Sequence, residues 1–168
     1  INAYLGNLED HPEHPSPPTS LKDWIALNEA HQEQVMPFFA QELFEKAERR
    51  DDLSSETYLE SLKECRRLSR QQGIDAFMQK HGLDAFIAPT SGPAWLTDSV
   101  NGDPVSIETS FTPSAVAGYP GISVPLGFIS GLPVGLSFYG GAWSERMLLR
   151  CAHAFENATK AQIAPEIS

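Results

Sequence analysis

The sequence predicts an α/β protein in which helices come first and a mixed sheet covered by helices follows. Two differences between the halves of the 168-residue chain carry this prediction. Residues 1–80 hold nine Lys and Arg and fifteen Asp and Glu, while residues 81–168 hold three and seven. Glycine is distributed the other way, with two of its twelve positions before Gly82 and ten from it onward. A charged, glycine-poor stretch is typical of amphipathic helices, and frequent glycine of strands and turns.

The first helices are predicted by their caps and breaks. Four prolines between Asp10 and Thr19 indicate an extended segment, because proline lacks the backbone donor that a helix needs. Ser20 followed by Asp23 resembles a capping box, and apolar residues at near-helical spacing come after it. Pro37 then breaks this helix or opens the next one. Helices are thus expected on both sides of Pro37.

A longer helix is predicted from Ser54 or Ser55 to a glycine stop at Gly82. The run 83–88 after it is short and largely apolar and ends at Pro89, which is the pattern of a strand buried on both faces. Helix, glycine and buried strand in this order are how an α/β sheet is assembled. The apolar stripe of the long helix consists of Tyr58, Leu59, Leu62, Cys65 and Leu68.

The last third of the chain should supply a hairpin between two helices. A short helix is predicted over 113–117, and two strands over 121–127 and 133–139. Because Ser130 and a glycine lie between the strands, a tight hairpin is the simplest connection. Ser144 caps a final helix with an apolar face.

Composition excludes several classes of protein. The formal charge of −10 argues against a nucleic-acid partner, which would require a basic face. No apolar run approaches the roughly 20 residues of a membrane span, so no membrane partner is expected. Cys65 and Cys151 are too few for a disulfide scaffold, and free thiols indicate a reducing compartment such as the cytoplasm. The chain opens on Ile1 without an initiator Met or a signal peptide, so we expect a piece of a longer protein.

A search for catalytic patterns finds none that is complete. His11 and His14 are three residues apart, but the prolines around them make a helical metal site improbable, and no metal or cofactor is expected. The sequence has no phosphate-binding loop and no Gly-x-Ser-x-Gly nucleophile elbow. Ser123 and Ser137 come nearest to an elbow, yet both lie inside predicted strands, which favours core or sheet-facing serines.

Four longer runs are nevertheless specific. They are Asn2-Ala3-Tyr4-Leu5, Leu83-Asp84-Ala85-Phe86-Ile87-Ala88-Pro89-Thr90, Ala117-Gly118-Tyr119-Pro120-Gly121-Ile122-Ser123-Val124-Pro125-Leu126-Gly127 and Gly131-Leu132-Pro133-Val134-Gly135-Leu136-Ser137-Phe138. Together they resemble the C-terminal part of the amidase signature family, and the resemblance covers nearly the whole chain. It implies a fragment of the amidase signature fold, in which 1–168 is one C-terminal part, mainly helical over 1–82 and with strands and helices over 83–168.

Members of this family hydrolyse carboxylic amides to acid and ammonia, and some are amidotransferase subunits. Their chemistry uses a Ser-Ser-Lys triad whose nucleophilic serine lies in a Gly/Ser-rich stretch of the N-terminal part. Because this chain has no such stretch, no catalytic residue is assigned to it. We expect the full-length protein to be an amidase acting on a small-molecule amide, and this chain alone to be inactive.

The resemblance places part of the substrate pocket just ahead of the Ala117-Gly118 corner. The implied substrate-binding residues there are Glu108, Thr109, Ser110 and Phe111, where Glu108 matches an acidic residue that holds a substrate amine in some amidotransferase members. Trp95 lies past the end of a predicted strand, where ligands of sheets tend to bind, and either a pocket role or a packing role suits it.

Two alternatives stay open. Instead of the C-terminal region of an amidase, the chain could be a non-catalytic module for folding or oligomerisation, or a relative of amidotransferase subunits. A piece of a larger sheet exposes strand edges and apolar helix faces, so self-association is expected.

Overall fold

The computed structural model describes residues 1–8, 16–103 and 109–164. Within these ranges the chain forms two compact units, Ile1–Ser55 and Glu56–Ser168. The first is helical and the second combines helices with a sheet. The boundary precedes the change of composition near Gly82, because the long helix ahead of Gly82 packs with the sheet-containing unit. The predicted proline-rich segment and the His11–His14 pair lie largely or wholly in 9–15, outside the described residues.

The first unit is built from short helices joined by polar contacts. Ser20 caps α2 as predicted, since the Asp23 backbone N–H donates to Ser20 Oγ at 3.2 Å. The return contact differs from that of a capping box, because Ser20 Oγ donates to Asp23 Oδ2 at 2.6 Å. Gln41 is buried, and its Nε2 donates to the Ile25 carbonyl at 3.1 Å. The helices are α1 (Asn2–Leu5), α2 (Leu21–Ala30), α3 (Gln32–Val35) and α4 (Glu42–Glu48).

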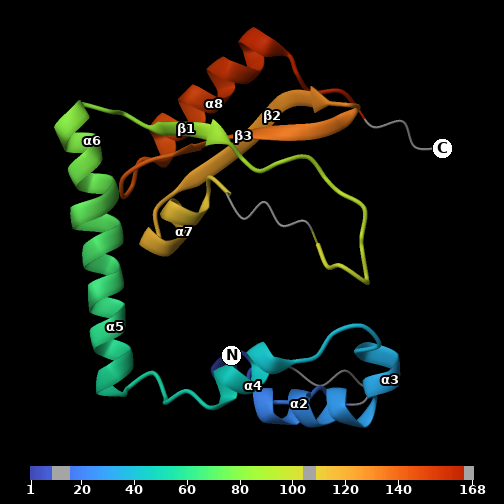
Figure 1. Cartoon of the computed structure of the whole chain (residues 1–168). Helices are drawn as coiled ribbons and strands as arrows, with labels where there is room; N and C mark the ends of the chain where they lie inside the picture. Colours follow the sequence, from blue (N-terminus) through green and yellow to red (C-terminus); the bar gives the residue numbers. More distant parts are fainter. Residues whose placement is uncertain (9–15, 104–108, 165–168) are drawn as a thin grey trace. The chain divides into compact units, whose positions relative to one another are not determined.

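The second unit begins with one long helical segment (Figure 1), which runs through α5 (Glu56–Arg66), η1 (Arg67–Ile74) and α6 (Asp75–His81) and is kinked at Gly73. It ends at Gly82, whose φ of 61° gives the predicted glycine stop. Gly73 has non-helical angles inside η1, and a Cβ on it would lie 2.6 Å from the Leu68 carbonyl oxygen. The close approach of these two backbone segments therefore requires glycine.

The sheet has three strands in the order β1-β3-β2, and every pair is antiparallel. β2 (Gly121–Ile129) and β3 (Leu132–Tyr139) form the predicted hairpin, in which Ser130 and Gly131 both have positive φ. β1 (Phe86–Pro89) pairs with the other side of β3, with Phe86 opposite Tyr139. The α/β class predicted from the sequence is confirmed, although the described strands pair only antiparallel and not in the predicted mixed arrangement.

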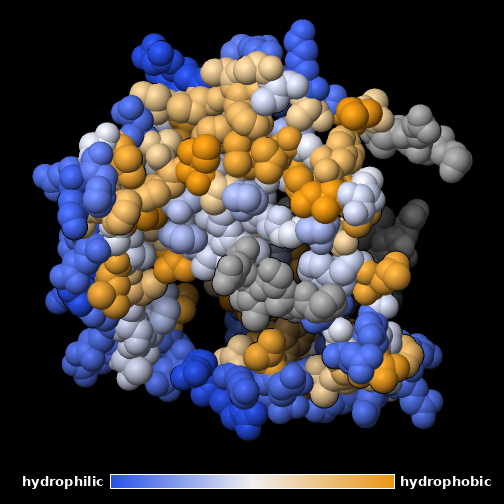
Figure 2. Space-filling view, turned by 45° about the horizontal axis from the view of Figure 1, so that its top comes forward, coloured by the Kyte–Doolittle hydropathy of each residue, from blue (hydrophilic) through white to orange (hydrophobic). Residues whose placement is uncertain are grey.

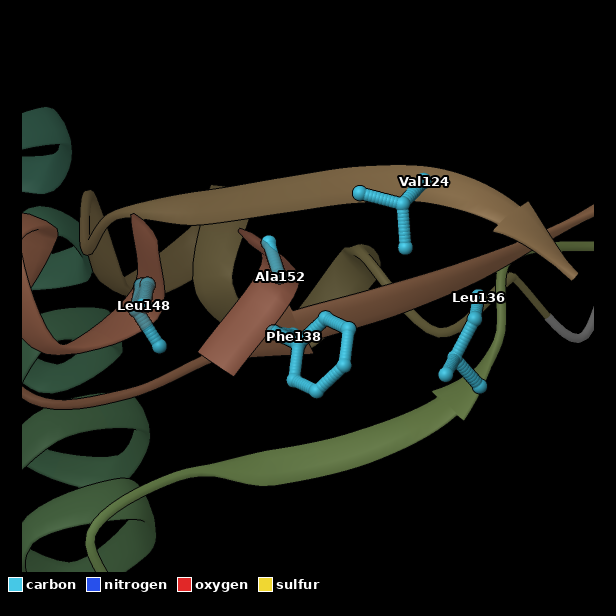
Figure 3. Packing of buried hydrophobic residues seen from close by; sticks show 5 residues of the cluster. All are labelled: Val124, Leu136, Phe138, Leu148 and Ala152. Carbon is cyan, nitrogen blue, oxygen red and sulfur yellow. The ribbon is translucent and has the colours of Figure 1, made fainter. Parts of the chain in front are cut away.

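Two further helices flank the sheet. α7 (Thr112–Ala117) precedes β2 and ends at Gly118, while α8 (Glu145–Thr159) follows β3 and packs on β2 and β3. Between α8 and the sheet lies the core of the unit, a cluster of buried apolar residues that point toward one another (Figure 3). The cluster is Val124, Leu136, Phe138, Leu148 and Ala152.

Two expectations about burial were wrong. β1, which was predicted to be buried on both faces, lies at an edge of the sheet, and Ile87 is 62% exposed. A short apolar run cannot distinguish a central strand from an edge strand whose outer face is uncovered. The stripe on α5 is also largely exposed, because no residue of that helix is buried.

Candidate functional site

The face of the sheet opposite α8 carries a row of small and polar side chains. Leu136 and Phe138 of β3 point toward α8, so Ser137 between them points to the opposite face. The strand register sets Ser137 directly between Ala88 of β1 and Ser123 of β2. A sheet face of this composition lacks the branched apolar side chains that pack under a helix.

Three hydroxyls on this face form a closed ring. Thr90 Oγ1 donates to Ser123 Oγ at 3.3 Å, and the oxygens of Ser123 and Ser137 lie 2.8 Å apart. The third side joins Ser137 Oγ and Thr90 Oγ1, also at 2.8 Å. Because each hydroxyl has a single proton, the Thr90 donation requires that Ser137 donates to Thr90 and Ser123 to Ser137. We call Thr90, Ser123 and Ser137 the hydroxyl ring.

Thr90 reaches the ring because position 135 has no side chain. The Thr90 backbone N–H donates to the Gly135 carbonyl at 2.8 Å, which continues the β1–β3 pairing by one residue. A Cβ on Gly135 would lie 2.7 Å from Thr90 Oγ1 and 3.3 Å from Thr90 Cβ. Glycine at this position therefore leaves the space that the Thr90 side chain occupies.

The ring borders a small cavity between α7 and the sheet. The cavity has a volume of about 310 Å³, and its lining includes Ser123 and Ser137 from the ring and Phe111, Ser114 and Tyr119 from the α7 region. The side chain of Ser137 is buried, with 3% of the residue exposed, whereas Ser123 is exposed. Two of the three ring residues thus line the cavity, and Ser123 is the most exposed member of the ring.

A larger, mostly apolar groove of about 1350 Å³ runs between the η1–α6 segment and the β1–α7 side of the sheet. Ile74, Phe77 and Phe86 contribute apolar walls, and Thr109 and Ser110 lie on its rim. The buried Oγ of Ser69, which also lines the groove, has no hydrogen-bond partner among the described residues.

A polar clamp made of Arg70, Asp75 and Tyr119 joins the long helical segment to α7. Arg70 Nε donates to the Ala117 carbonyl at 2.6 Å, and its guanidinium lies 5.5 Å from the centre of the Tyr119 ring. Tyr119 Oη in turn donates to Asp75 Oδ2 at 2.9 Å. Burial raises the pKa of the Tyr119 phenol, and the hydrogen bond to Asp75 and its charge raise it further, while Arg70 opposes them.

The structure brings together some of the predicted site residues and separates others. The Ser110 backbone N–H donates to the Thr90 carbonyl at 3.2 Å, and Thr109 Oγ1 lies 2.7 Å from Thr112 Oγ1. Both residues line the groove, and Phe111 lines the small cavity. The predicted pocket segment thus lies against the end of β1, beside the hydroxyl ring.

The remaining two predicted residues are not part of this arrangement. Trp95 is 49% exposed, and its Nε1 donates to Asp103 Oδ1 at 3.1 Å within its own loop. It lines neither the groove nor the small cavity. Glu108 lies in 104–108, outside the described residues.

Sequence reasoning missed Thr90 and the three residues of the clamp. Thr90 ends one of the specific runs, directly after Pro89, but its contacts with Ser123 and Ser137 depend on strand register. The clamp depends on a contact between Arg70 and Ala117 that spans 47 positions. Neither leaves a local signal in the sequence.

The chemistry of the ring is limited by its neighbours. Among the residues that the structure describes, no charged side chain hydrogen-bonds to Thr90, Ser123 or Ser137. A serine hydroxyl needs an adjacent base to act as a nucleophile, so the ring is suited to binding and not to attack. Within the same described ranges there is no group of three potential metal ligands and no helix long and apolar enough to cross a membrane.

The family model for amidases matches residues 7–149, which includes the hydroxyl ring, the clamp and the groove. The chain belongs to the amidase family. The resemblance carried by the four sequence runs is thereby confirmed.

Solved structures of amidase-family proteins have the same fold. A peptide amidase in complex with the competitive inhibitor chymostatin superposes with a TM-score of 0.87 at 42% identity, over 99% of this chain and 32% of that one. The native peptide amidase of Stenotrophomonas maltophilia gives a TM-score of 0.79 at 43% identity, over 92% of this chain and 31% of that one. The predicted amidase signature fold is confirmed by these likenesses.

Curated amidase relatives match in sequence as well. A probable amidase of Arabidopsis thaliana is 37% identical over 171 residues, which covers 99% of this chain and 28% of that protein. A glutamyl-tRNA(Gln) amidotransferase subunit of Marinobacter nauticus is 44% identical over 105 residues, or 61% of this chain and 21% of that protein. The chain thus spans less than a third of the length of these relatives.

Proposed function

We propose that this chain is the C-terminal region of an amidase that hydrolyses a carboxylic amide to an acid and ammonia. In this proposal the Ser-Ser-Lys triad lies in a part of the protein outside these 168 residues, and the chain supplies sheet, covering helices and part of the substrate pocket. The observation that carries the proposal is the match to peptide amidase over 99% of this chain at 42% identity.

The geometry of the site supports a binding role. The segment Thr109–Phe111 lies against the end of β1, and its residues line both the groove and the small cavity. No described group activates any of the ring serines. A region that only binds substrate needs cavity walls and hydrogen-bonding hydroxyls but no catalytic base, because the catalytic groups come from another part of the enzyme.

Ammonia release tests the proposal in two proteins. The 168-residue chain alone should release no ammonia from amino-acid or peptide amides. A chimera in which the chain replaces the matching third of peptide amidase should release it, because its fold and pocket wall would complete the enzyme. The proposal is contradicted if the chain alone releases ammonia and this release disappears when one of its serines is replaced. It is also contradicted if the chimera folds but releases no ammonia.

A second candidate is a role as an amidotransferase component, favoured by the 44% identity to the glutamyl-tRNA(Gln) amidotransferase subunit of Marinobacter nauticus. The two roles differ in the amide that is hydrolysed, so glutamine and a peptide amide should be compared as ammonia donors in the chimera.

The free cysteines Cys65 and Cys151 support a reducing compartment, and we place the protein in the cytoplasm.

A further inference from the structure

We propose that the hydroxyl ring of Thr90, Ser123 and Ser137 is the binding site for the N–H groups of an uncharged carboxamide. This inference rests on the proposed function, because it names the part of the substrate that this chain would hold. It goes further in assigning the residues and the direction of the hydrogen bonds.

The closed ring fixes which partner it can accept. Three hydroxyls have three protons, and the contacts of 3.3, 2.8 and 2.8 Å use all three within the ring. Each oxygen has two acceptor sites and uses one of them, so every oxygen keeps one free lone pair. The ring therefore accepts hydrogen bonds from a ligand but has no donor left for a carbonyl or carboxylate.

The surroundings favour a neutral donor over a cation. No charged side chain in the described part of the chain hydrogen-bonds to the ring, and Ser137 is buried, with 3% of the residue exposed. An ammonium group loses much of its hydration on binding to this buried residue, and no described carboxylate compensates for that loss. The amide NH₂ group carries N–H donors without a net charge, so it suits the ring better.

The shape of the sheet face gives such a group access. Ala88 and Gly135 flank Ser137 and Thr90 with little or no side chain, and Ser123 at the outer side of the ring is exposed. The adjoining cavity of about 310 Å³ has room for a small organic group. Covering this face with an apolar helix instead would bury three free lone pairs without partners, which is costly.

The test titrates the isotope-labelled 168-residue chain with four small probes and follows its backbone amide signals by NMR. The probes are propionamide, N,N-dimethylpropionamide, propionate and n-propylammonium. Propionamide should shift the signals of the ring residues in a saturable way. The dimethyl compound, which has the same carbonyl but no N–H, should bind about tenfold more weakly, the factor that about 1.4 kcal/mol represents.

Three variants sharpen the result. Ser123→Ala leaves two hydroxyls that share one contact, so one proton becomes free; propionamide binding should fall and a response to propionate should appear. Ser123→Thr keeps the hydroxyl and should retain the wild-type preference. Ser61→Ala on the exposed surface of α5 is the matched control and should change nothing.

Several outcomes overturn the inference. The first is that propionamide shifts no signals of the ring residues. The second is that the dimethyl compound, propionate or n-propylammonium binds as tightly as propionamide. The third is that Ser123→Ala keeps the wild-type preference among the probes. The proposed function is tested separately, by ammonia release from the chimera. An active chimera whose chain does not bind propionamide refutes the ring alone, whereas binding together with an inactive chimera refutes the hydrolytic role alone.

Discussion

Gly135 sets the position of Thr90, and through it the whole ring, by having no side chain. The first side-chain carbon of any larger residue at this position would lie 2.7 Å from Thr90 Oγ1 and 3.3 Å from Thr90 Cβ. Well-packed regions resist the insertion of even one methyl group, because neighbouring atoms have no free volume into which to move. The site is therefore sensitive to a change that alters no hydrogen-bonding group.

Gly135→Ala is expected to lower the free energy of unfolding by about 1 to 3 kcal/mol, the usual cost of overpacking. The same change in a Thr90→Ala background should cost clearly less, because the atom 2.7 Å away is gone. Urea unfolding of the four proteins measures both effects. Gly92→Ala, whose added carbon would meet nothing within 4 Å, is the control, and equal costs in the two backgrounds would contradict the argument.

At the residue scale, predictions from the sequence succeeded for features that follow from the alternating pattern of side chains along a strand. Ser123 and Ser137 were predicted to be core or sheet-facing serines inside strands, and both lie in strands, opposite each other in the β2–β3 register. Their connection to Thr90 was not predictable, because it requires the pairing of β1 with β3 across 47 positions. The predicted pocket residues Thr109 to Phe111 came from a family resemblance, and their roles remain predictions.

At the scale of elements, the clamp makes the long helical segment and α7 one unit. Arg70 binds the last carbonyl of α7, where a cation also interacts favourably with the helix dipole. Tyr119 follows the glycine that ends α7, and Asp75 is the first residue of α6. The clamp fixes the corner that leads into β2 and the hydroxyl ring.

The stability provided by Tyr119 should depend on pH in one direction. Its pKa is raised on folding, so its contribution is complete below the unfolded value of about 10 and disappears as the pH rises through the folded value. Wild type should exceed Tyr119→Phe in unfolding free energy at pH 8 by about 1 kcal/mol, with a smaller difference at pH 11. Tyr4→Phe, on an exposed residue, is the control; a constant difference for Tyr119→Phe would refute the assignment.

Element boundaries were predicted well where a cap or a glycine marks them. Ser20, Gly82 and Gly118 each mark the helix end expected from the sequence. The position of β1 at an edge was not predictable, because strand order depends on contacts between distant segments. The kink at Gly73 in the long segment was also missed, because the sequence pattern predicts a helix that continues past this glycine to Gly82.

At the scale of the whole molecule, several large apolar side chains lie on the surface and not in the core. Phe38, Phe39 and Leu43 in the first unit and Ile87 in the second are largely exposed. Figure 2 shows hydrophobic surface gathered in the upper part of the view, over the sheet-containing unit. Such patches and an open strand edge are typical of surfaces that another protein segment covers.

We therefore predict self-association of the chain. Its mean mass in light scattering should rise with concentration, because the outer edge of β1 can pair with a second copy. Ile87→Lys places a charge on this edge and should reduce the association, whereas Leu96→Lys in an exposed loop should not. A monomeric wild-type protein over a wide concentration range would contradict the prediction.

The order in which the hydroxyl ring assembles follows from the hairpin. Ser123 and Ser137 are 14 positions apart and meet as soon as β2 and β3 close around their two-residue turn. Thr90 comes from 47 positions away, and closing that larger loop costs more chain entropy. During folding the third hydroxyl should therefore arrive last, so the ring is completed only when β1 docks.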